Sequence, residues 1–333
     1  GRGEGGRKGG RVFVRERKGG REGEGETLWQ RPVMVDWSQT AGCVIAWFAL
    51  NIAIGNLNGW ILKHHGFSYP VMLTAIHMLC CWSLSAIALA TVFRPDDPRP
   101  VSRETVAKVR MLALAFCASV ALGNIALRFI FVSFSQMVSA ASPFFTMLLM
   151  RAMVGKKYSL SQYGAIIPMC GGVMMCTVGE LNFNIIGFLA VVGSTLLRGI
   201  KSIMQGRLLT APEDRLDAMM LLYHMSRESI LPLGAFSALA EYHALYDPQL
   251  SGAGSFRLWM LIVLSGLVSF FLNIANFLVT KYTSAVMLQV LGNVKVVLSI
   301  MVSLFIFGNK VSMSSTIGCA ITLAGVAAYN VLK

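Results

Sequence analysis

The chain has little charge. Only 14% of its 333 residues are Asp, Glu, Lys or Arg, whereas a typical soluble domain carries about 25%. In contrast, 55% of the residues are hydrophobic and the mean hydropathy is +0.62. A chain of this composition cannot cover its surface with polar side chains in one or two soluble domains. The composition excludes an ordinary soluble enzyme and a wholly disordered chain, and it predicts an all-α polytopic membrane protein.

Paired cysteines and enzyme signatures are also missing. The seven cysteines form no CxxC pair and have no metal-ligand spacing, so we expect neither a metal site nor a cofactor. The chain contains no Walker A, HExxH or GxSxG pattern, so we name no catalytic residue and do not expect an enzyme. Without a nucleotide-hydrolysing motif, any transport is expected to depend on exchange or on an ion gradient.

Long apolar runs begin after Trp37 and are separated by short polar breaks. A helix needs about 20 apolar residues to cross the hydrocarbon of a bilayer. The Gly/Arg/Glu-rich stretch over residues 1–36 cannot form a core, and we expect it to be a disordered tail. The runs predict ten spans, over about 40–62, 70–93, 109–131, 134–153, 161–178, 183–207, 217–241, 257–280, 284–307 and 313–332.

Basic residues predict the orientation of these spans. The formal charge of +13 is not gathered on one soluble face, so we expect no nucleic-acid partner. The loops between the predicted spans form two sets, one on each side of the membrane. One set carries only Lys63, Arg257 and Lys310 as basic residues, together with three acidic residues. By the positive-inside rule the richer set is cytosolic, and an even number of spans then places both termini in the cytosol. The richer set contains Arg94, Arg99, Arg103, Lys108, Arg110, Arg151, Lys156, Lys157, Arg207, Arg215 and Lys281.

An internal repeat recurs at an offset of 153 residues. The segment GKKYSLSQYGAIIPMCGGV, from Gly155, resembles GNKVSMSSTIGCAITLAGV, from Gly308, and Gln136 has the same offset from Gln289. Five spans in each half would insert the halves in opposite directions, as in alternating-access transporters. This predicts one five-helix repeat over 37–180 and a second over 181–333. Chance similarity between two apolar hairpins is the alternative.

Charged and polar groups within the predicted spans are candidates for function, because burying them in hydrocarbon is costly. Lys295 lies near the middle of the ninth span with no acid within one helical turn. An anionic substrate would supply its counter-charge, and a distant acid in another span is the alternative. Gln289 and Asn293, on the preceding turns, would bind substrate or bond neighbouring helices.

The sixth span contains a second pair of cations. Arg198 and Lys201 are three residues apart and therefore share one face of the predicted helix. An arginine can grip a phosphate or carboxylate with two parallel hydrogen bonds, and Lys201 is expected either to join it or to extend toward the cytosolic edge.

Four further candidates lie in the fourth and seventh predicted spans. His224 and Glu228 are four residues apart in the seventh span, a spacing that suits either a structural ion pair or a proton-coupling site. Gln136 and Ser139 in the fourth span would face a central cavity if the repeat is real.

Several segments resemble the triose-phosphate translocator family of the drug/metabolite transporter superfamily. They are GNIALRFIFVSFSQMVSAASPFFTMLL, LLRGIKSIMQGRLL, TSAVMLQVLGNVKVVLSIMVSLFIFGNKVS and GCAITLAGVAAYNVLK. LRGIKS and DRLDAMMLLY are similar to the branch of solute carrier family 35 called subfamily E, member 4. The resemblance covers about 37–333 and implies ten helices, inverted repeats and exchange by alternating access.

The resemblance also implies a phosphate site in which several contacts differ here. Arg198 and Lys295 match the family's cations, but Ser139 stands where a span-four lysine is expected and Val296 where an arginine follows the span-nine lysine. These differences favour a bulkier anion, such as a nucleotide sugar, over a triose phosphate.

We therefore expect a secondary transporter, in particular an antiporter, for a sugar phosphate or nucleotide sugar. Its partners would be this small anionic metabolite and the lipid bilayer, and a homodimer is left open. The membrane of the Golgi or the endoplasmic reticulum is the expected location. A scaffold or regulator that keeps the transporter fold without transporting is the alternative.

Overall fold

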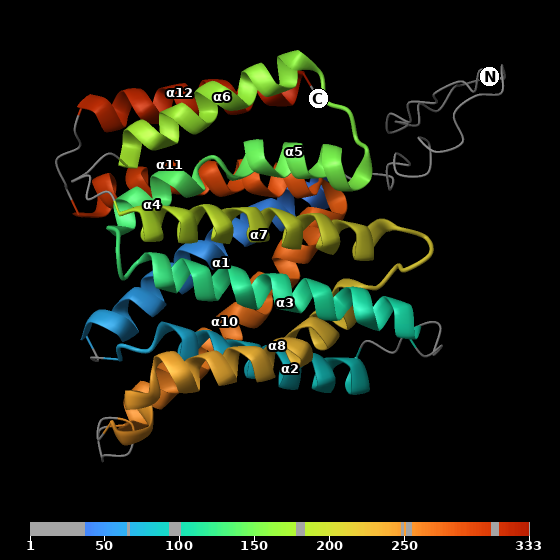
Figure 1. Ribbon diagram of the computed structural model, residues 1–333, viewed down its shortest axis with the longest axis vertical. Coiled ribbons are helices and arrows are strands. Elements are labelled where there is room, and N and C mark those ends of the chain that lie inside the picture. The colour runs from blue at the N-terminus through green and yellow to red at the C-terminus, as the bar shows by residue number, and fades with distance from the viewer. Residues whose placement is uncertain are drawn as a thin grey trace, which may run out of the picture. The chain divides into compact units, whose positions relative to one another are not determined.

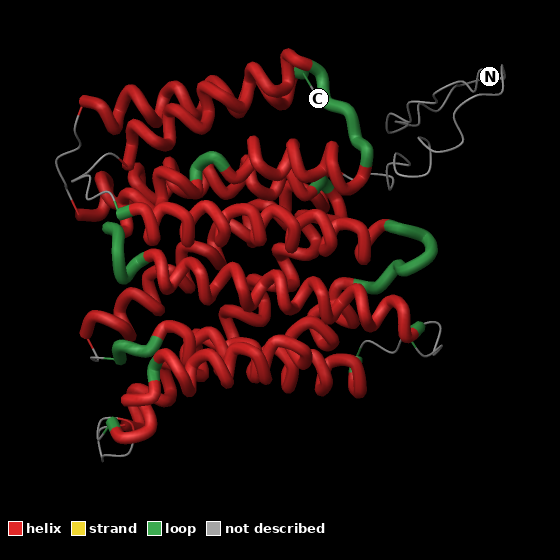
Figure 2. Tube along the Cα trace, viewed as in Figure 1, coloured by secondary structure: helices red, strands yellow, loops and turns green. Residues whose placement is uncertain are grey.

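The computed structural model describes residues 37–64, 67–92, 101–177, 184–247, 250, 255–307 and 313–332. The predicted tail over 1–36 lies outside these ranges. The described part of the chain consists of helices and the turns between them (Figure 2). The helices are α1 (Trp37–His64), α2 (Pro70–Thr91), α3 (Arg103–Ala126), α4 (Val132–Ser139), α5 (Ser142–Val154), α6 (Leu160–Thr177), α7 (Ile185–Thr210), α8 (Ala218–Ala240), η1 (Tyr242–Tyr246), α10 (Ser255–Tyr282), α11 (Ala285–Phe307) and α12 (Met313–Val331).

The prediction of an all-α multi-pass membrane protein is confirmed. Six helical segments of the described chain are long and apolar enough to cross a bilayer, and two shorter apolar helices lie over 285–298 and 316–331. Each predicted span overlaps a helix, with α4 and α5 together covering the fourth. The exact count of ten spans stays a prediction.

Local sequence explains where several helices begin and end. The Oγ of Ser102 accepts a hydrogen bond from the backbone N–H of Thr105 and caps α3, and Asn184 caps α7 in the same way. Gly155 ends α5 with a φ of 73°, in the left-handed region that glycine enters without strain. Capping residues can thus lie outside the apolar run that predicts a span. For example, α3 begins at Arg103, several residues before the predicted span that begins at about residue 109.

The fourth predicted span is interrupted, which differs from the expected continuous helix. α4 ends at Ser139 and α5 begins at Ser142, with Pro143 in its first turn. Proline has no backbone N–H to donate to the carbonyl four residues earlier, and that carbonyl of Ser139 instead accepts a hydrogen bond from the Ser142 hydroxyl.

The helices pack as pairs within the unit Met34–Lys333. α6 and α12 lie side by side at the top of Figure 1, and α2 and α8 at the bottom, with the other helices between them. α7 packs against α3, α5, α10 and α11, which gives it a central place. The largest cluster of buried apolar side chains joins α2, α3, α7, α8 and α10.

Glycine allows α6 and α12 to approach closely. A Cβ added at Gly172 would lie 2.5 Å from Thr322 Oγ1 and 2.7 Å from the Thr322 backbone N. A Cβ added at Gly325 would lie 2.8 Å from both the Cβ and the backbone N of Met169. Two glycines, one on each helix, are therefore needed for this contact.

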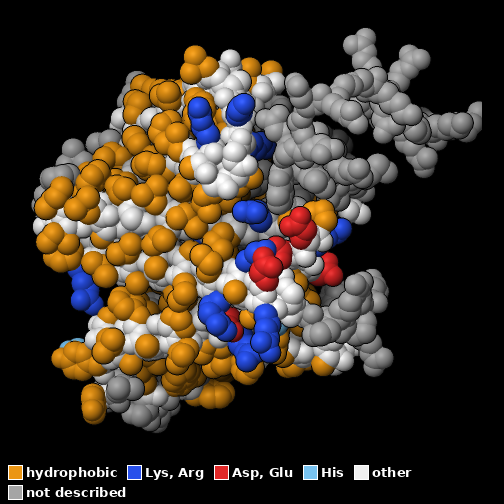
Figure 3. All heavy atoms as spheres, turned by 45° about the vertical axis from the view of Figure 1, so that its right-hand side comes forward, with side chains coloured by type: hydrophobic (Ala, Val, Ile, Leu, Met, Phe, Trp, Pro, Cys, Tyr) orange, Lys and Arg blue, Asp and Glu red, His pale blue; other side chains and the backbone are white. Residues whose placement is uncertain are grey.

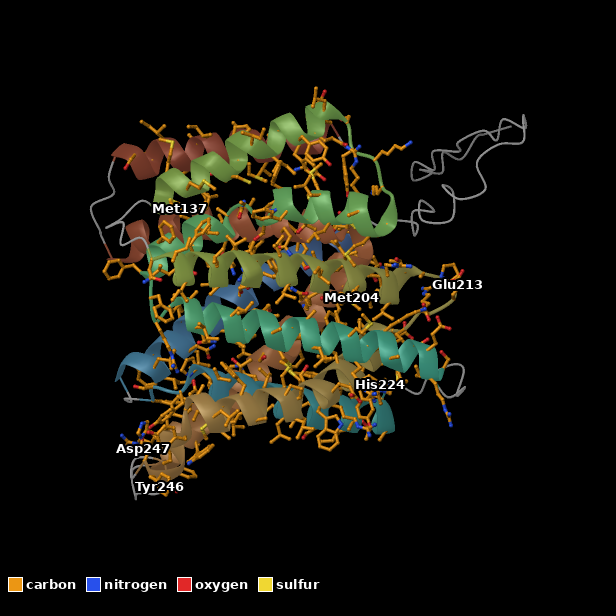
Figure 4. The ribbon with its side chains drawn as sticks, in the orientation of Figure 1. Met137, Met204, Glu213, His224, Tyr246 and Asp247 are labelled. Carbon is orange, nitrogen blue, oxygen red and sulfur yellow. The ribbon has the colours of Figure 1, made fainter. Side chains whose placement is uncertain are left out.

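Charged side chains gather at one end of the helices. Figure 3 turns the right-hand side of Figure 1 forward, and Lys, Arg, Asp and Glu cluster there, while hydrophobic side chains cover much of the remaining visible surface. Lys108 Nζ pairs with Asp214 at 2.5 Å and with Glu104 at 2.9 Å. At the opposite end, where Asp247 is labelled in Figure 4, its carboxylate accepts a 3.0 Å hydrogen bond from the Tyr69 hydroxyl.

Candidate functional site

Arg198 lies on the central helix α7. Its side chain is exposed in the described part of the chain, although many protein atoms lie around the guanidinium. An arginine there can form two parallel, charge-assisted hydrogen bonds with a phosphate or carboxylate.

Lys295 lies on α11, half-buried, and its charge interacts with that of Arg198. Its Nζ donates a 3.3 Å hydrogen bond to Oδ1 of Asn51 on α1. Asn51 is in turn fixed by its own amide, which donates a 2.7 Å hydrogen bond to the carbonyl of Trp47 one turn earlier. The partner of Lys295 in the described chain is thus a neutral amide and not a carboxylate.

Lys201 lies one turn after Arg198 on α7 and is half-buried. Its Nζ lies 5.6 Å from the ring centroid of Phe277 and 6.0 Å from that of Phe116, within the range of a cation–π interaction. Its charge also interacts with that of Arg198. One aromatic ring of α3 and one of α10 therefore lie near the ammonium.

The three cations share one electrostatic feature. The ion pairs between described residues join Lys108 to Glu104 and Asp214, Arg110 to Glu228, and Lys281 to Asp217. None of these pairs includes Arg198, Lys201 or Lys295. Like charges repel strongly where water is partly excluded, so this arrangement favours binding of an anion.

Gln289 and Asn293 are buried and bonded to neighbouring helices. The Gln289 amide donates a 2.8 Å hydrogen bond to the Ser202 hydroxyl of α7. The Asn293 amide donates a 2.9 Å hydrogen bond to the Ala140 carbonyl, at the break between α4 and α5. Of the two alternatives that the sequence left open, these contacts favour the bonding of helices over direct substrate contact.

Gln136 and Ser139 lie on α4, before the break. Gln136 is exposed and Ser139 is half-buried. The hydrogen bond from Asn293 brings the end of α4 against α11. The structure thus places Ser139 near the helix that carries Lys295, but it gives no contact of Gln136 or Ser139 with the three cations.

The expected pair of His224 and Glu228 does not form an ion pair. Both residues lie in the described part of the chain, and the Glu228 carboxylate instead accepts a 2.9 Å hydrogen bond from Arg110 Nε of α3. His224 has its ring edge-on to Tyr223, at 5.1 Å between centroids. It lies toward the end of the helices at which Glu213 is labelled (Figure 4). Glu228 thus pairs with a residue of another helix and acts on His224 only through its charge, and the alternative of a proton-coupling site stays a prediction.

Sequence reasoning missed Asn51. It is a polar residue in the long apolar helix α1, so the criterion that selected Lys295 would also have selected it. Its partner could not have been found in this way, because 244 residues separate the two.

Comparisons with known proteins agree with a transporter fold. The model of the Triose-phosphate Transporter family matches residues 38–330. A probable sugar phosphate/phosphate translocator of Arabidopsis thaliana is 36% identical over 294 residues, which cover 88% of this chain and 95% of that protein. UDP-uronic acid transporter 1 of the same plant is 36% identical over 290 residues, or 87% of this chain and 94% of its own length.

A third relative is human solute carrier family 35 member E4, which is 34% identical over 293 residues, covering 88% of this chain and 80% of that protein. A solved crystal structure superposes with a TM-score of 0.64 at 18% identity and covers 88% of this chain and 99% of its own. At that identity the likeness concerns the fold alone.

Proposed function

Because the chain belongs to the triose-phosphate transporter family, we propose that it is a secondary transporter that exchanges one organic anion for another across an endomembrane. The observation that carries this proposal is the group of Arg198, Lys201 and Lys295, for which the described residues supply no carboxylate partner. A bound anion would neutralise cations that otherwise repel one another.

Alternating access is the proposed mechanism, and the packing of α6 with α12 supports the inverted repeat behind it. An offset of 153 residues converts Gly172 into Gly325 and Met169 into Thr322. The contact of Gly172 with Thr322 and that of Gly325 with Met169 are then one contact with the halves exchanged. Such reciprocity is what a two-fold relation between two halves requires.

A second contact fits the same relation. Asn293 is bonded to Ala140, and these two residues are themselves 153 positions apart. A residue can touch its own counterpart only close to the axis that relates the halves. We therefore propose that this axis passes between α11 and the break of α4 and α5, and that a substrate beside Lys295 would lie at the interface of the halves.

The proposed substrate is a sugar phosphate or a nucleotide sugar. Relatives of this chain include proteins named for each of these classes. Ser139 and Val296 are uncharged at positions where the resemblance implies a lysine and an arginine. Each missing charge-assisted hydrogen bond removes about 1.5–3 kcal/mol, and this favours a larger anion, with additional contacts, over a triose phosphate.

The proposed location is the membrane of the Golgi or the endoplasmic reticulum, with both termini in the cytosol. The end with Lys108, Asp214 and Lys281 would then face the cytosol, in accord with the positive-inside rule. An epitope added after Lys333 should be accessible to antibody when only the plasma membrane is permeabilised.

Counterflow in proteoliposomes tests the function. Vesicles are loaded with a nucleotide sugar, a hexose phosphate or inorganic phosphate, and uptake of a labelled substrate from outside is measured. Loaded vesicles should take up the label, whereas vesicles without an internal counter-substrate should not. Lys295→Ala should insert and fold but lose uptake. Exchange of triose phosphate for inorganic phosphate without exchange of nucleotide sugars would refute the preference for a larger anion. No exchange with any member of a broad anion panel would favour the scaffold alternative.

A further inference from the structure

Asn51 of α1 is the only described side chain to which Lys295 donates a hydrogen bond. Building on the proposed function, we infer that Asn51 is a positioning residue that holds the Lys295 ammonium in place without neutralising it. The structure thereby assigns α1 a part in the site, although the charged residues of the site all lie on α7 and α11.

The orientation of the Asn51 amide follows from its two contacts. Its nitrogen lies 2.7 Å from the Trp47 carbonyl oxygen, a contact that only an N–H donor can make. The amide oxygen must therefore face the other way, and it accepts the 3.3 Å hydrogen bond from Lys295 Nζ. Because the donor side is tied to the backbone of its own helix, the acceptor side has little freedom to turn.

A neutral partner has a specific advantage at this position. An ammonium has three donors, and Asn51 accepts from one of them, so donors remain for a ligand. A carboxylate in the same place would pair with the ammonium and compete with an incoming anion. Asparagine and aspartate have nearly the same shape, so the chain could supply a carboxylate here with little steric change.

The burial of the two partners strengthens this argument. Both side chains are half-buried, where screening by water is weaker than at the surface. The positive charge of Arg198 also acts on Lys295. An amide dipole can hold the ammonium in place against this repulsion. Because the amide is neutral, the site keeps its positive charge and can still attract an anionic ligand.

The substitution Asn51→Asp tests the inference in purified protein. The new carboxylate should pair with Lys295, so the unliganded variant should unfold at the same temperature as the wild type or higher. Its affinity for the nucleotide sugar or hexose phosphate that the wild type binds should fall about tenfold or more, as expected for the loss of one charge-assisted contact. Asn51→Leu, which removes the hydrogen bond without adding charge, should bind more weakly than the wild type but better than Asn51→Asp.

Asn330→Asp is the matched control, because it makes the same chemical change at an exposed position in the last turn of α12. It should bind the probe as the wild type does. If Asn51→Asp also binds as the wild type does, the inference is overturned. If Asn51→Leu and Asn51→Asp are weakened to the same degree with equal loss of thermal stability, Asn51 has only a packing role.

A double-mutant cycle in the absence of ligand separates this inference from the proposed function. Asn51→Asp should leave the unfolding temperature unchanged or raise it when Lys295 is present, and should lower it in the Lys295→Ala background, where the new carboxylate lacks its ammonium partner. Absence of coupling overturns the assignment of Asn51. Failure of the wild type to bind any anion refutes the proposed function instead, whatever the cycle gives.

Discussion

The contact of α6 with α12 should not tolerate a single methyl group at Gly172. The Cβ of alanine would lie 2.6 Å from the Gly318 carbonyl oxygen and 2.7 Å from the Thr322 backbone N, whereas ordinary contacts of a Cβ begin at 3.4 Å. The gap falls short by about 0.7–0.8 Å, and the atoms concerned belong to the backbone. A side chain could turn away, but here one helix must move from the other.

The size of the effect follows from this geometry. Forcing extra volume into a well-packed interface costs about 1–3 kcal/mol. The higher helix propensity of alanine returns about 1 kcal/mol, so the free energy of unfolding should fall by up to about 2 kcal/mol. Gly325→Ala, whose Cβ would lie 2.8 Å from the Met169 backbone N, should cost a similar amount.

Gly171→Ala is a matched control on the adjacent residue, because a Cβ at Gly171 meets no atom within 4 Å. Thermal unfolding of the purified variants in one detergent gives the comparison. Gly172→Ala should unfold a few degrees below the wild type, and Gly171→Ala at or above it. Equal midpoints for these two variants would refute the described approach of the two helices.

Three further predictions concern the ends of the helices and the break in the fourth span. Glu241→Gln should lower the thermal unfolding midpoint by an amount equivalent to about 1 kcal/mol. The reason is that the Glu241 carboxylate accepts hydrogen bonds of 2.9 and 2.8 Å from two backbone N–H groups in the first turn of α2. An unchanged midpoint would contradict this. Hydrogen bonding from Lys108 lowers the pKa of Asp214 below its ordinary value of 3.8, so its contribution to stability is present above pH 3.8 and is lost as the pH falls through the lower folded value. The stability advantage of the wild type over Asp214→Asn should accordingly shrink in strong acid and persist at neutral pH, and an advantage that is the same at every pH would refute it. Asn293→Leu should lower the free energy of unfolding by about 1–3 kcal/mol, because it leaves the Ala140 carbonyl without its hydrogen-bond donor. A variant as stable as the wild type would show that this hydrogen bond is dispensable.

The all-helical fold and the approximate positions of the helices along the chain could be predicted from the sequence, because apolar length alone identifies a segment that can cross a bilayer. The break in the fourth span was not predicted, although Pro143 was visible. A proline is tolerated inside α6 and α8, at Pro168 and Pro232, so its presence does not decide between a kink and a break. At Pro143 the freed groups find partners in Ser142 and in Asn293 of a distant helix.

The candidate site could be predicted from the sequence only as a set of residues. Charges are rare and costly in apolar helices, so the sequence singled out Arg198 and Lys295 as candidates. Partners were not accessible, because helical spacing says which residues share a face and not what that face meets. The ion pair of Glu228 with Arg110 and the hydrogen bond of Lys295 with Asn51 both join residues of different helices, and neither was predicted.

The claim at the centre of this account is that cations of α7 and α11 await an anion. Its most direct test is the equilibrium binding of one nucleotide sugar, identified by screening the wild type, to the wild type and to Arg198→Gln at the same ionic strength. Removing one charge-assisted contact of about 1.5–3 kcal/mol should weaken binding about tenfold or more while the protein stays folded. Equal affinities for the two proteins, or equally tight binding of the uncharged sugar, would contradict the claim.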